Sequence, residues 1–76
     1  MTRETFVREM MKAYTFARLR QRPYYWEGYQ RGLRRAYYGE VFGTVEEHNW
    51  WLSLANDEMD ESRRECGLGY RDGLSV

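Results

Sequence analysis

The sequence contains few of the residues from which disulfide frameworks, metal centres and membrane spans are built. It has one cysteine (Cys66), one histidine (His48), one proline and no isoleucine among 76 residues. A single cysteine excludes an intrachain disulfide, and one cysteine with one histidine cannot supply the ligands of a structural zinc site. No apolar run approaches the roughly 18 residues of a membrane span, and residues 1–19 lack the apolar core of a signal peptide. We therefore expect a cytoplasmic protein with no metal and no cofactor.

The sequence also lacks the groupings of residues that support catalysis. His48 lies between two polar residues, as surface histidines do, and Cys66 occupies an apolar helical position, where a thiol is usually inert. The acidic stretch 57–61 lacks the glycine turn and the roughly 12-residue register of a calcium loop, and no glycine-rich phosphate loop is present. We expect a protein that is not an enzyme.

Aromatic side chains supply much of the apolar material that is present. There are seven Tyr, three Trp and three Phe, beside six Leu and four Val. A chain of this length buries only about 60% of its unfolded surface, so we expect one domain, residues 1–76, of marginal stability. Tyr, Trp and Arg are abundant here, and these are the residues enriched at binding hot spots.

Apolar residues recur at three- and four-residue steps, which predicts an all-α fold, a small single-domain bundle of three to four helices. The expected helices cover residues 3–20, 23–38, 45–55 and 58–72. Pro23 suits a first helical turn, and Thr44 with Glu47 matches a capping box. Asn56 and Asp57 can end the third helix and cap the fourth. In the third helix we expect Trp51 to face the core and Trp50 to be partly exposed. The first helix has one broad apolar stripe that we expect to face the core: Phe6, Val7, Met10, Met11, Ala13, Tyr14 and Ala17.

A short repeat, Gly-Tyr-x-x-Gly-Leu, occurs at Gly28–Leu33 and again at Gly69–Leu74. Two glycines four positions apart on one helix face remove side chains there, so that another backbone can approach closely. One interpretation is that Gly-x-x-x-Gly notches in the second and fourth helices dock against each other. The other is that Gly73 is only a helix C-cap and the match arises by chance. The sequence leaves both interpretations open.

The two halves of the chain carry opposite charge. Residues 1–37 contain nine Lys or Arg and three acids, a net charge of +6, whereas residues 38–76 contain three Arg and nine acids, a net charge of −6. Folding can pair these halves, or it can leave a basic face for an acidic partner and an acidic face for a basic one.

The most basic stretch, residues 18–35, interleaves arginines with aromatic rings. It fits a solvated helix face that pairs with the acids of the last helix, a surface that binds an acidic protein, or a site for RNA or single-stranded nucleic acid. A nucleic-acid binder normally carries net positive charge, which this chain lacks, so of the two binding interpretations we favour the protein partner. The candidate partner-binding residues are Arg18, Arg20, Arg22, Tyr24, Tyr25, Arg31, Arg34, Arg35 and Trp50.

Three segments together resemble the ribosome modulation factor family: Gly28-Tyr29-Gln30-Arg31-Gly32, Trp51-Leu52 and Gly69-Tyr70-Arg71. That family forms a small helical hairpin and binds the ribosome. The resemblance therefore implies a ribosome-associated or RNA-associated protein as the alternative function. The chain departs from the family in lacking its strong basicity and its central Cys-Pro-Tyr.

The main functional prediction is a non-catalytic protein-binding module, an inhibitor or adaptor that acts on a larger macromolecular machine. A short, charge-segregated chain rich in Tyr, Trp and Arg is analogous in type to phage and mobile-element proteins, including anti-defence inhibitors such as anti-CRISPRs, with which it shares no motif. The scarcity of aliphatic residues and the complementary charged halves also favour a homodimer.

Overall fold

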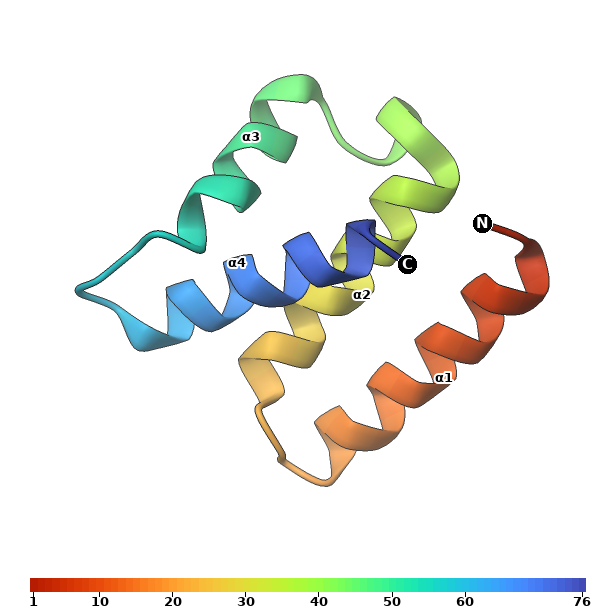
Figure 1. Ribbon diagram of the computed structural model, residues 1–76, viewed down its shortest axis with the longest axis horizontal. Coiled ribbons are helices and arrows are strands. Elements are labelled where there is room, and N and C mark those ends of the chain that lie inside the picture. Colours follow the sequence, from red (N-terminus) through yellow and green to blue (C-terminus); the bar gives the residue numbers. More distant parts are fainter.

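The computed structural model describes residues 1–76, and every regular element in it is helical. The elements are α1 (Arg3–Arg18), α2 (Pro23–Tyr38), the 3-10 helix η1 (Gly39–Phe42), α3 (Val45–Leu54) and α4 (Glu61–Leu74) (Figure 1). The prediction of a small all-α bundle is confirmed, and α2 has the predicted bounds. Thr2 and Thr44 cap α1 and α3, because each hydroxyl accepts a hydrogen bond from the amide three residues ahead, at 3.1 Å in both cases.

The last helix differs from its prediction at both ends. It begins at Glu61 because Asp60 is its cap, and the Asp57 carboxylate instead accepts hydrogen bonds from the amides of Met59 and Asp60 in a turn. Gly73 does not end α4, which continues to Leu74. The interpretation of Gly73 as a simple helix terminator is therefore wrong.

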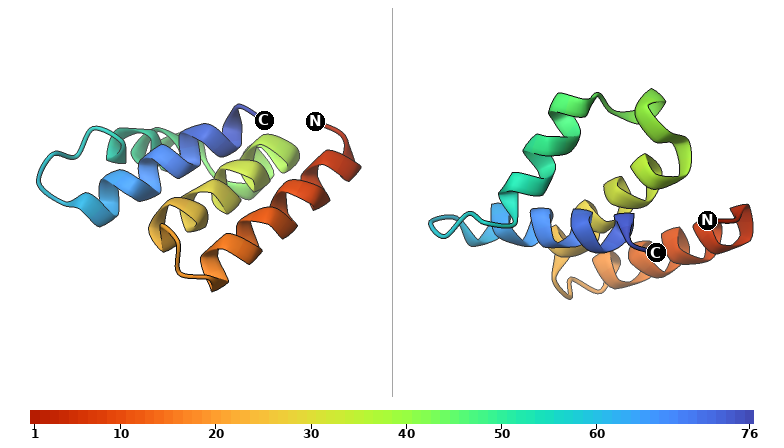
Figure 2. Two further views of the ribbon diagram at one scale, coloured as in Figure 1. Left: turned by 60° about the horizontal axis from the view of Figure 1, so that its bottom comes forward. Right: turned by 45° about the horizontal axis from the view of Figure 1, so that its top comes forward.

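The helices α2 and α4 cross at the centre of the molecule and share its most extensive contact. α1 packs against α2 and α3 packs against α4, so these two helices lie on opposite sides of the central pair (Figure 1). The molecule is flat, with extents of 37 × 31 × 15 Å, and Figure 2 shows it from two further directions. Only 12 of the 76 residues are buried, so most helices present one uncovered face to solvent.

Glycines line the crossing of α2 and α4 from both sides. A Cβ atom added to Gly28 would overlap the carbonyl oxygen of Cys66, and one added to Gly32 would overlap that of Tyr70. From the other helix, Gly69 faces the carbonyl oxygen of Tyr25 just as closely, and Gly73 faces that of Tyr29. The two backbones approach to a distance that no larger residue permits, which explains glycines that would otherwise weaken both helices.

Around this crossing the core is small and partly aromatic. Met10 and Ala13 of α1 pack with Tyr29 and Leu33 of α2, and half-buried rings of Phe6, Tyr25 and Trp26 surround them. On the other side Tyr70 is 1% exposed, and the half-buried ring of Trp51 stacks on it with the centroids 5.5 Å apart. Trp50 is 52% exposed, as predicted.

Candidate partner-binding surface

Two of the predicted binding residues hold the start of α2 to α4. The Arg22 guanidinium makes two hydrogen bonds to the Glu65 carboxylate, at 2.8 and 2.9 Å, and lies over the Tyr25 ring. The Tyr25 hydroxyl donates to the Asp72 carboxylate at 2.6 Å. The hydrogen bonds from Arg22 lower the pKa of Glu65, while burial and then the bond to Asp72 raise the pKa of Tyr25 to about 12. Both side chains are thus engaged within the fold.

Arg31 and Arg35 lie at the junction of α2, η1, α3 and α4. Arg31 pairs with Glu47 at 3.2 Å and lies over the rings of Phe42 and Trp51. The Glu47 carboxylate is therefore used across the junction, and the structure has no bond from it back to Thr44, so only the threonine half of the predicted capping box forms.

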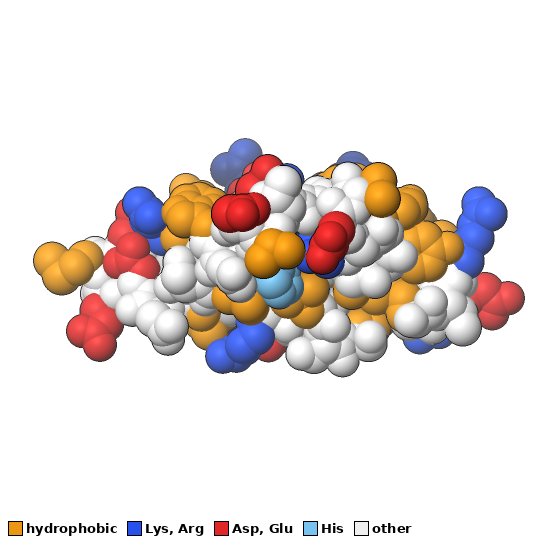
Figure 3. Space-filling model, turned by 90° about the horizontal axis from the view of Figure 1, so that it is seen from above, with side chains coloured by type: hydrophobic (Ala, Val, Ile, Leu, Met, Phe, Trp, Pro, Cys, Tyr) orange, Lys and Arg blue, Asp and Glu red, His pale blue; other side chains and the backbone are white.

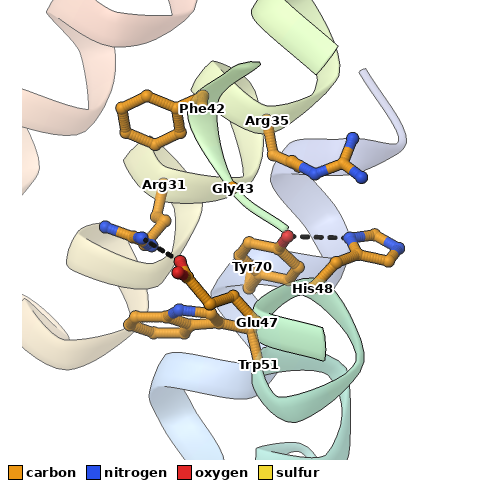
Figure 4. Close-up of a pocket in the computed structure, with 8 residues that line it drawn as sticks. All are labelled: Arg31, Arg35, Phe42, Gly43, Glu47, His48, Trp51 and Tyr70. Carbon is orange, nitrogen blue, oxygen red and sulfur yellow. Dashed lines mark hydrogen bonds and ion pairs between the residues drawn. The ribbon is translucent and has the colours of Figure 1, made fainter. Parts of the chain in front are cut away.

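Arg35 has a different environment in the same junction. It extends along Gly43, and its Nε atom is buried without a hydrogen-bond partner. Arg31 and Arg35 point away from each other on opposite sides of the Tyr70 ring (Figure 4). The space among these side chains is too narrow to admit a water molecule, so the junction is packed rather than open.

The one histidine belongs to this junction as well. The Nδ1 atom of His48 lies 2.8 Å from the Tyr70 hydroxyl, whose pKa is raised by burial. His48 is half-buried, and Figure 3 shows its imidazole reaching the surface among hydrophobic and acidic side chains. His48 therefore provides a hydrogen-bond partner for a hydroxyl group that the fold has buried.

The remaining predicted residues are distributed over separate surfaces. Arg34 donates to the Tyr14 hydroxyl of α1 at 3.3 Å, and Arg18 and Arg20 lie exposed at the end of α1 and in the turn after it. Tyr24 is 49% exposed at the start of α2. Trp50 is exposed on α3, which lies on the opposite side of the central pair from α1, and the Arg63 guanidinium lies over its ring. The nine predicted residues therefore do not form one continuous face.

The outer face of α1 is the surface that sequence reasoning missed. Val7, Met11 and Tyr14 were expected to face the core, and this part of the prediction is wrong: they are 47%, 65% and 49% exposed. The reason is geometric, because α1 packs on α2 alone, and one neighbouring helix covers only the flank that carries Met10 and Ala13. The excessive width of the predicted apolar stripe was the signal that could have revealed a second face.

The exposed residues form a stripe with a cation at each end. Arg3, Val7, Met11, Tyr14 and Arg18 follow one another at steps of four, four, three and four, which places them on one side of the helix. We call these five residues the α1 stripe. Neither of its arginines has an ion-pair partner, whereas Arg22 and Arg31 do.

The acid nearest the middle of α1 does not neutralise the stripe, because it faces inward. The Glu9 carboxylate accepts hydrogen bonds from the Tyr29 hydroxyl at 2.5 Å and from the Lys12 ammonium at 2.6 Å. The bond from Lys12 and then that from Tyr29 lower the pKa of Glu9, and burial raises the pKa of Tyr29. The stripe therefore has an apolar centre, basic ends and one acid at its margin, Glu4.

In comparisons with known proteins, no family model, no curated protein and no solved structure matches this chain. No cluster of three or more His, Cys, Asp or Glu side chains is arranged to hold a metal ion. None of the helices combines the length and the apolar character that a membrane crossing requires.

Proposed function

We propose that this chain is a non-catalytic protein-binding module, an inhibitor or adaptor for a larger macromolecular assembly, and that it binds its partner through the α1 stripe. The observation that carries the proposal is an exposed row of apolar side chains on a helix whose opposite flank is already packed. Large apolar side chains that are gathered on one exposed surface mark interaction sites in soluble proteins. Tyr and Arg, which are enriched at binding hot spots, both occur in the stripe.

The charges of the stripe select the chemistry of the partner. With Arg3 and Arg18 unpaired at its two ends, the stripe is complementary to an amphipathic helix that has an apolar centre and carboxylates toward its ends. The stripe is about 22 Å long, since a helix rises about 1.5 Å per residue, which suits a partner helix of roughly four turns. A second copy of α1 fits poorly, because it would bring like charges together.

This proposal keeps Arg18 of the sequence-predicted set and adds residues of α1. Arg22, Tyr25 and Arg31 already have partners within the fold, and Arg35 is packed into the junction, so their contribution to binding would require those contacts to be given up. Arg20 lies exposed in the turn that follows the stripe, whereas Tyr24 lies beside Arg22 and Glu65 at the start of α2 and is not part of the stripe.

Affinity capture with matched variants tests the proposal. The affinity-tagged protein is used in lysate of the source cell, with and without nuclease treatment, and, in parallel, with a synthetic acidic amphipathic peptide of about 18 residues. We expect Met11→Glu and Arg18→Glu to abolish both interactions, and rising salt to weaken them. Met59→Glu is the control, because Met59 is 96% exposed in the loop before α4 and the substitution is chemically the same.

Two results would overturn this choice. Capture that survives Met11→Glu would show that the stripe is not the binding surface. Retardation of RNA in a gel at physiological salt, or capture of ribosomal particles that nuclease abolishes, would instead support the ribosome-associated alternative.

A further inference from the structure

One end of the α1 stripe opens into a groove between α1 and the last turn of α2. Phe6 and Val7 line it from α1, Tyr37 and Tyr38 line it from α2, and Arg3 lies at its rim. Its volume is about 280 Å³. Small-molecule sites usually span roughly 300–1,000 Å³, so this groove has the size for a side chain rather than for a cofactor.

Aromatic stacking fixes the walls of the groove. The rings of Phe6 and Tyr37 stack with their centroids 4.3 Å apart and their planes 8° apart. Tyr38 meets both rings edge to face, at 5.6 Å from Phe6 and 5.0 Å from Tyr37. Each ring therefore limits the rotation of the others, and a side chain that enters the groove finds its walls already positioned.

The rim of the groove adds a charge requirement. Arg3 has no ion-pair partner within the chain, and it is the first member of the α1 stripe as well as part of the groove lining. A ligand group in the groove would thus have a guanidinium beside it, with an exposed apolar surface continuing from Val7 toward Met11. Aromatic walls with a cation at the edge suit an apolar side chain that has a carboxylate next to it.

We infer that this groove is the anchor pocket of the partner-binding surface, and that it receives one Phe, Leu or Met side chain of the partner whose neighbouring carboxylate pairs with Arg3. The inference rests on the proposed function, since it names the part of the partner that would determine specificity. The rest of the partner helix then lies along the stripe toward Arg18. Hot spots of this kind combine a filled pocket with a surrounding rim that excludes water.

The first test uses a small probe, so that it does not depend on knowing the partner. N-acetyl-L-phenylalanine and its neutral amide are titrated into the isotopically labelled protein and followed by NMR. We expect saturable shifts at Phe6, Val7 and Tyr38, with the carboxylate form binding about threefold or more tightly than the amide. Arg3→Gln should remove that difference, and Tyr38→Ala should weaken both probes by about fivefold or more.

The second test compares two tyrosines in the capture experiment. Tyr38 and Tyr24 are 53% and 49% exposed and lie at opposite ends of α2, so Tyr38→Ala and Tyr24→Ala are matched substitutions. We expect Tyr38→Ala to weaken capture about tenfold and Tyr24→Ala to leave it unchanged. Loss of capture in Met11→Glu together with normal capture in Tyr38→Ala would refute the anchor pocket while leaving the binding module in place.

Other occupants give distinguishable results. Adenosine monophosphate that binds more tightly than N-acetyl-L-phenylalanine would identify a site for nucleic-acid bases and would overturn the inference. Self-association that both Tyr38→Ala and Met59→Ala abolish would also overturn it, because Met59 lies between Glu58 and Asp60 and would then be the apolar side chain of a second copy. Absence of any saturable shift with the probes would exclude the pocket directly.

Discussion

Where α2 crosses α4, backbone meets backbone; along the outer face of α1, long side chains meet solvent. Gly28 and Gly69 lie in the crossing with carbonyl oxygens of the opposite helix against their Cα atoms. Met11, in contrast, is 65% exposed although it follows a buried methionine in the sequence. The two helices can cross this closely because side chains are absent at the contact, whereas the outer face of α1 is defined by large side chains that are exposed to solvent. This contrast separates the residues that hold the molecule together from those that are available to another protein.

The difference also explains how so thin a molecule keeps a defined shape. Because few residues are buried, the aliphatic core contributes little to the free energy of unfolding. The close approach of two helices supplies packing contacts that large side chains would otherwise provide. Substitutions at the crossing should therefore change stability most, and substitutions on the outer face of α1 least.

Gly69→Ala should destabilise the fold by about 3 kcal/mol or more, because its Cβ atom would overlap the Tyr25 carbonyl oxygen and the two helices would have to separate. Gly43→Ala is the control. Its added Cβ would meet the Arg35 Cδ atom at 3.6 Å, an ordinary contact, so we expect a change within about 0.5 kcal/mol. Chemical denaturation measures both variants. If Gly69→Ala does not change the free energy of unfolding, the crossing tolerates a side chain, and the claim that it requires glycine is wrong.

The ion pair between Arg22 and Glu65 should make the central pair of helices sensitive to acid. The pKa of Glu65 in the folded state is lowered from its ordinary value of 4.5, mainly by the hydrogen bonds from Arg22. The stabilisation is therefore present above that value and is lost as the pH falls through the lower, folded-state pKa. The Arg22 side chain is 54% exposed, so we expect Glu65→Gln to cost only about 1 kcal/mol at pH 7.

Denaturation of Glu65→Gln across a pH series checks this sign. The difference in the free energy of unfolding between the two proteins should shrink as the pH is lowered below 4.5. A difference that stays constant down to pH 3 would mean that the Glu65 carboxylate does not stabilise the fold through its charge. The Glu9 carboxylate, whose pKa is also lowered, remains in both proteins and accounts for part of the acid sensitivity that persists.

Local signals in the sequence predict the helices but not their neighbours. The threonine caps and Pro23 mark helix starts because the interactions involve residues only a few positions apart. The start of α4 was misplaced because two aspartates compete as caps, and only the turn geometry shows that Asp57 binds the amides that precede the helix.

The pairing of the basic residues cannot be predicted for a similar reason. Arg22 and Arg31 find acids 43 and 16 positions away, and a one-dimensional charge pattern does not reveal which arginines are paired in this way. Val7, Met11 and Tyr14 are predicted to face the core because they are apolar residues at helical spacing, a pattern that cannot show how many helices surround α1. Sequence therefore predicts which residues share a helix face, and only the tertiary arrangement shows whether that face is covered.

A substitution in the turn between α1 and α2 should stabilise the protein without changing the helix crossing or the outer face of α1. Arg20 has a φ angle of 58°, in the left-handed region where a Cβ atom is unfavourable. We expect Arg20→Gly to stabilise the protein by about 0.5 kcal/mol, the relief of strain exceeding the added flexibility of the unfolded chain. A thermal melt should show a rise of about 2–4 °C. A fall would indicate that the Arg20 side chain makes a stabilising contact that outweighs the strain.

The smallest effect on stability should come from the stripe itself, and two adjacent methionines provide the test. Met10 is 8% exposed and Met11 is 65% exposed on the same helix. Met10→Ala should cost about 2–3 kcal/mol, because it leaves a cavity against Tyr29 and Leu33. Met11→Ala should change the free energy of unfolding by less than about 0.5 kcal/mol, since alanine is also a good helix former.

Denaturation at several protein concentrations, with sedimentation of the free protein, makes the measurement decisive. If Met11→Ala is as costly as Met10→Ala, and more so at high concentration, the stripe is covered by a second copy, and the predicted homodimer replaces the free binding face. If the cost of Met11→Ala stays small at every concentration, the exposed methionine contributes nothing to folding or self-association, and the stripe remains available to a partner outside the chain.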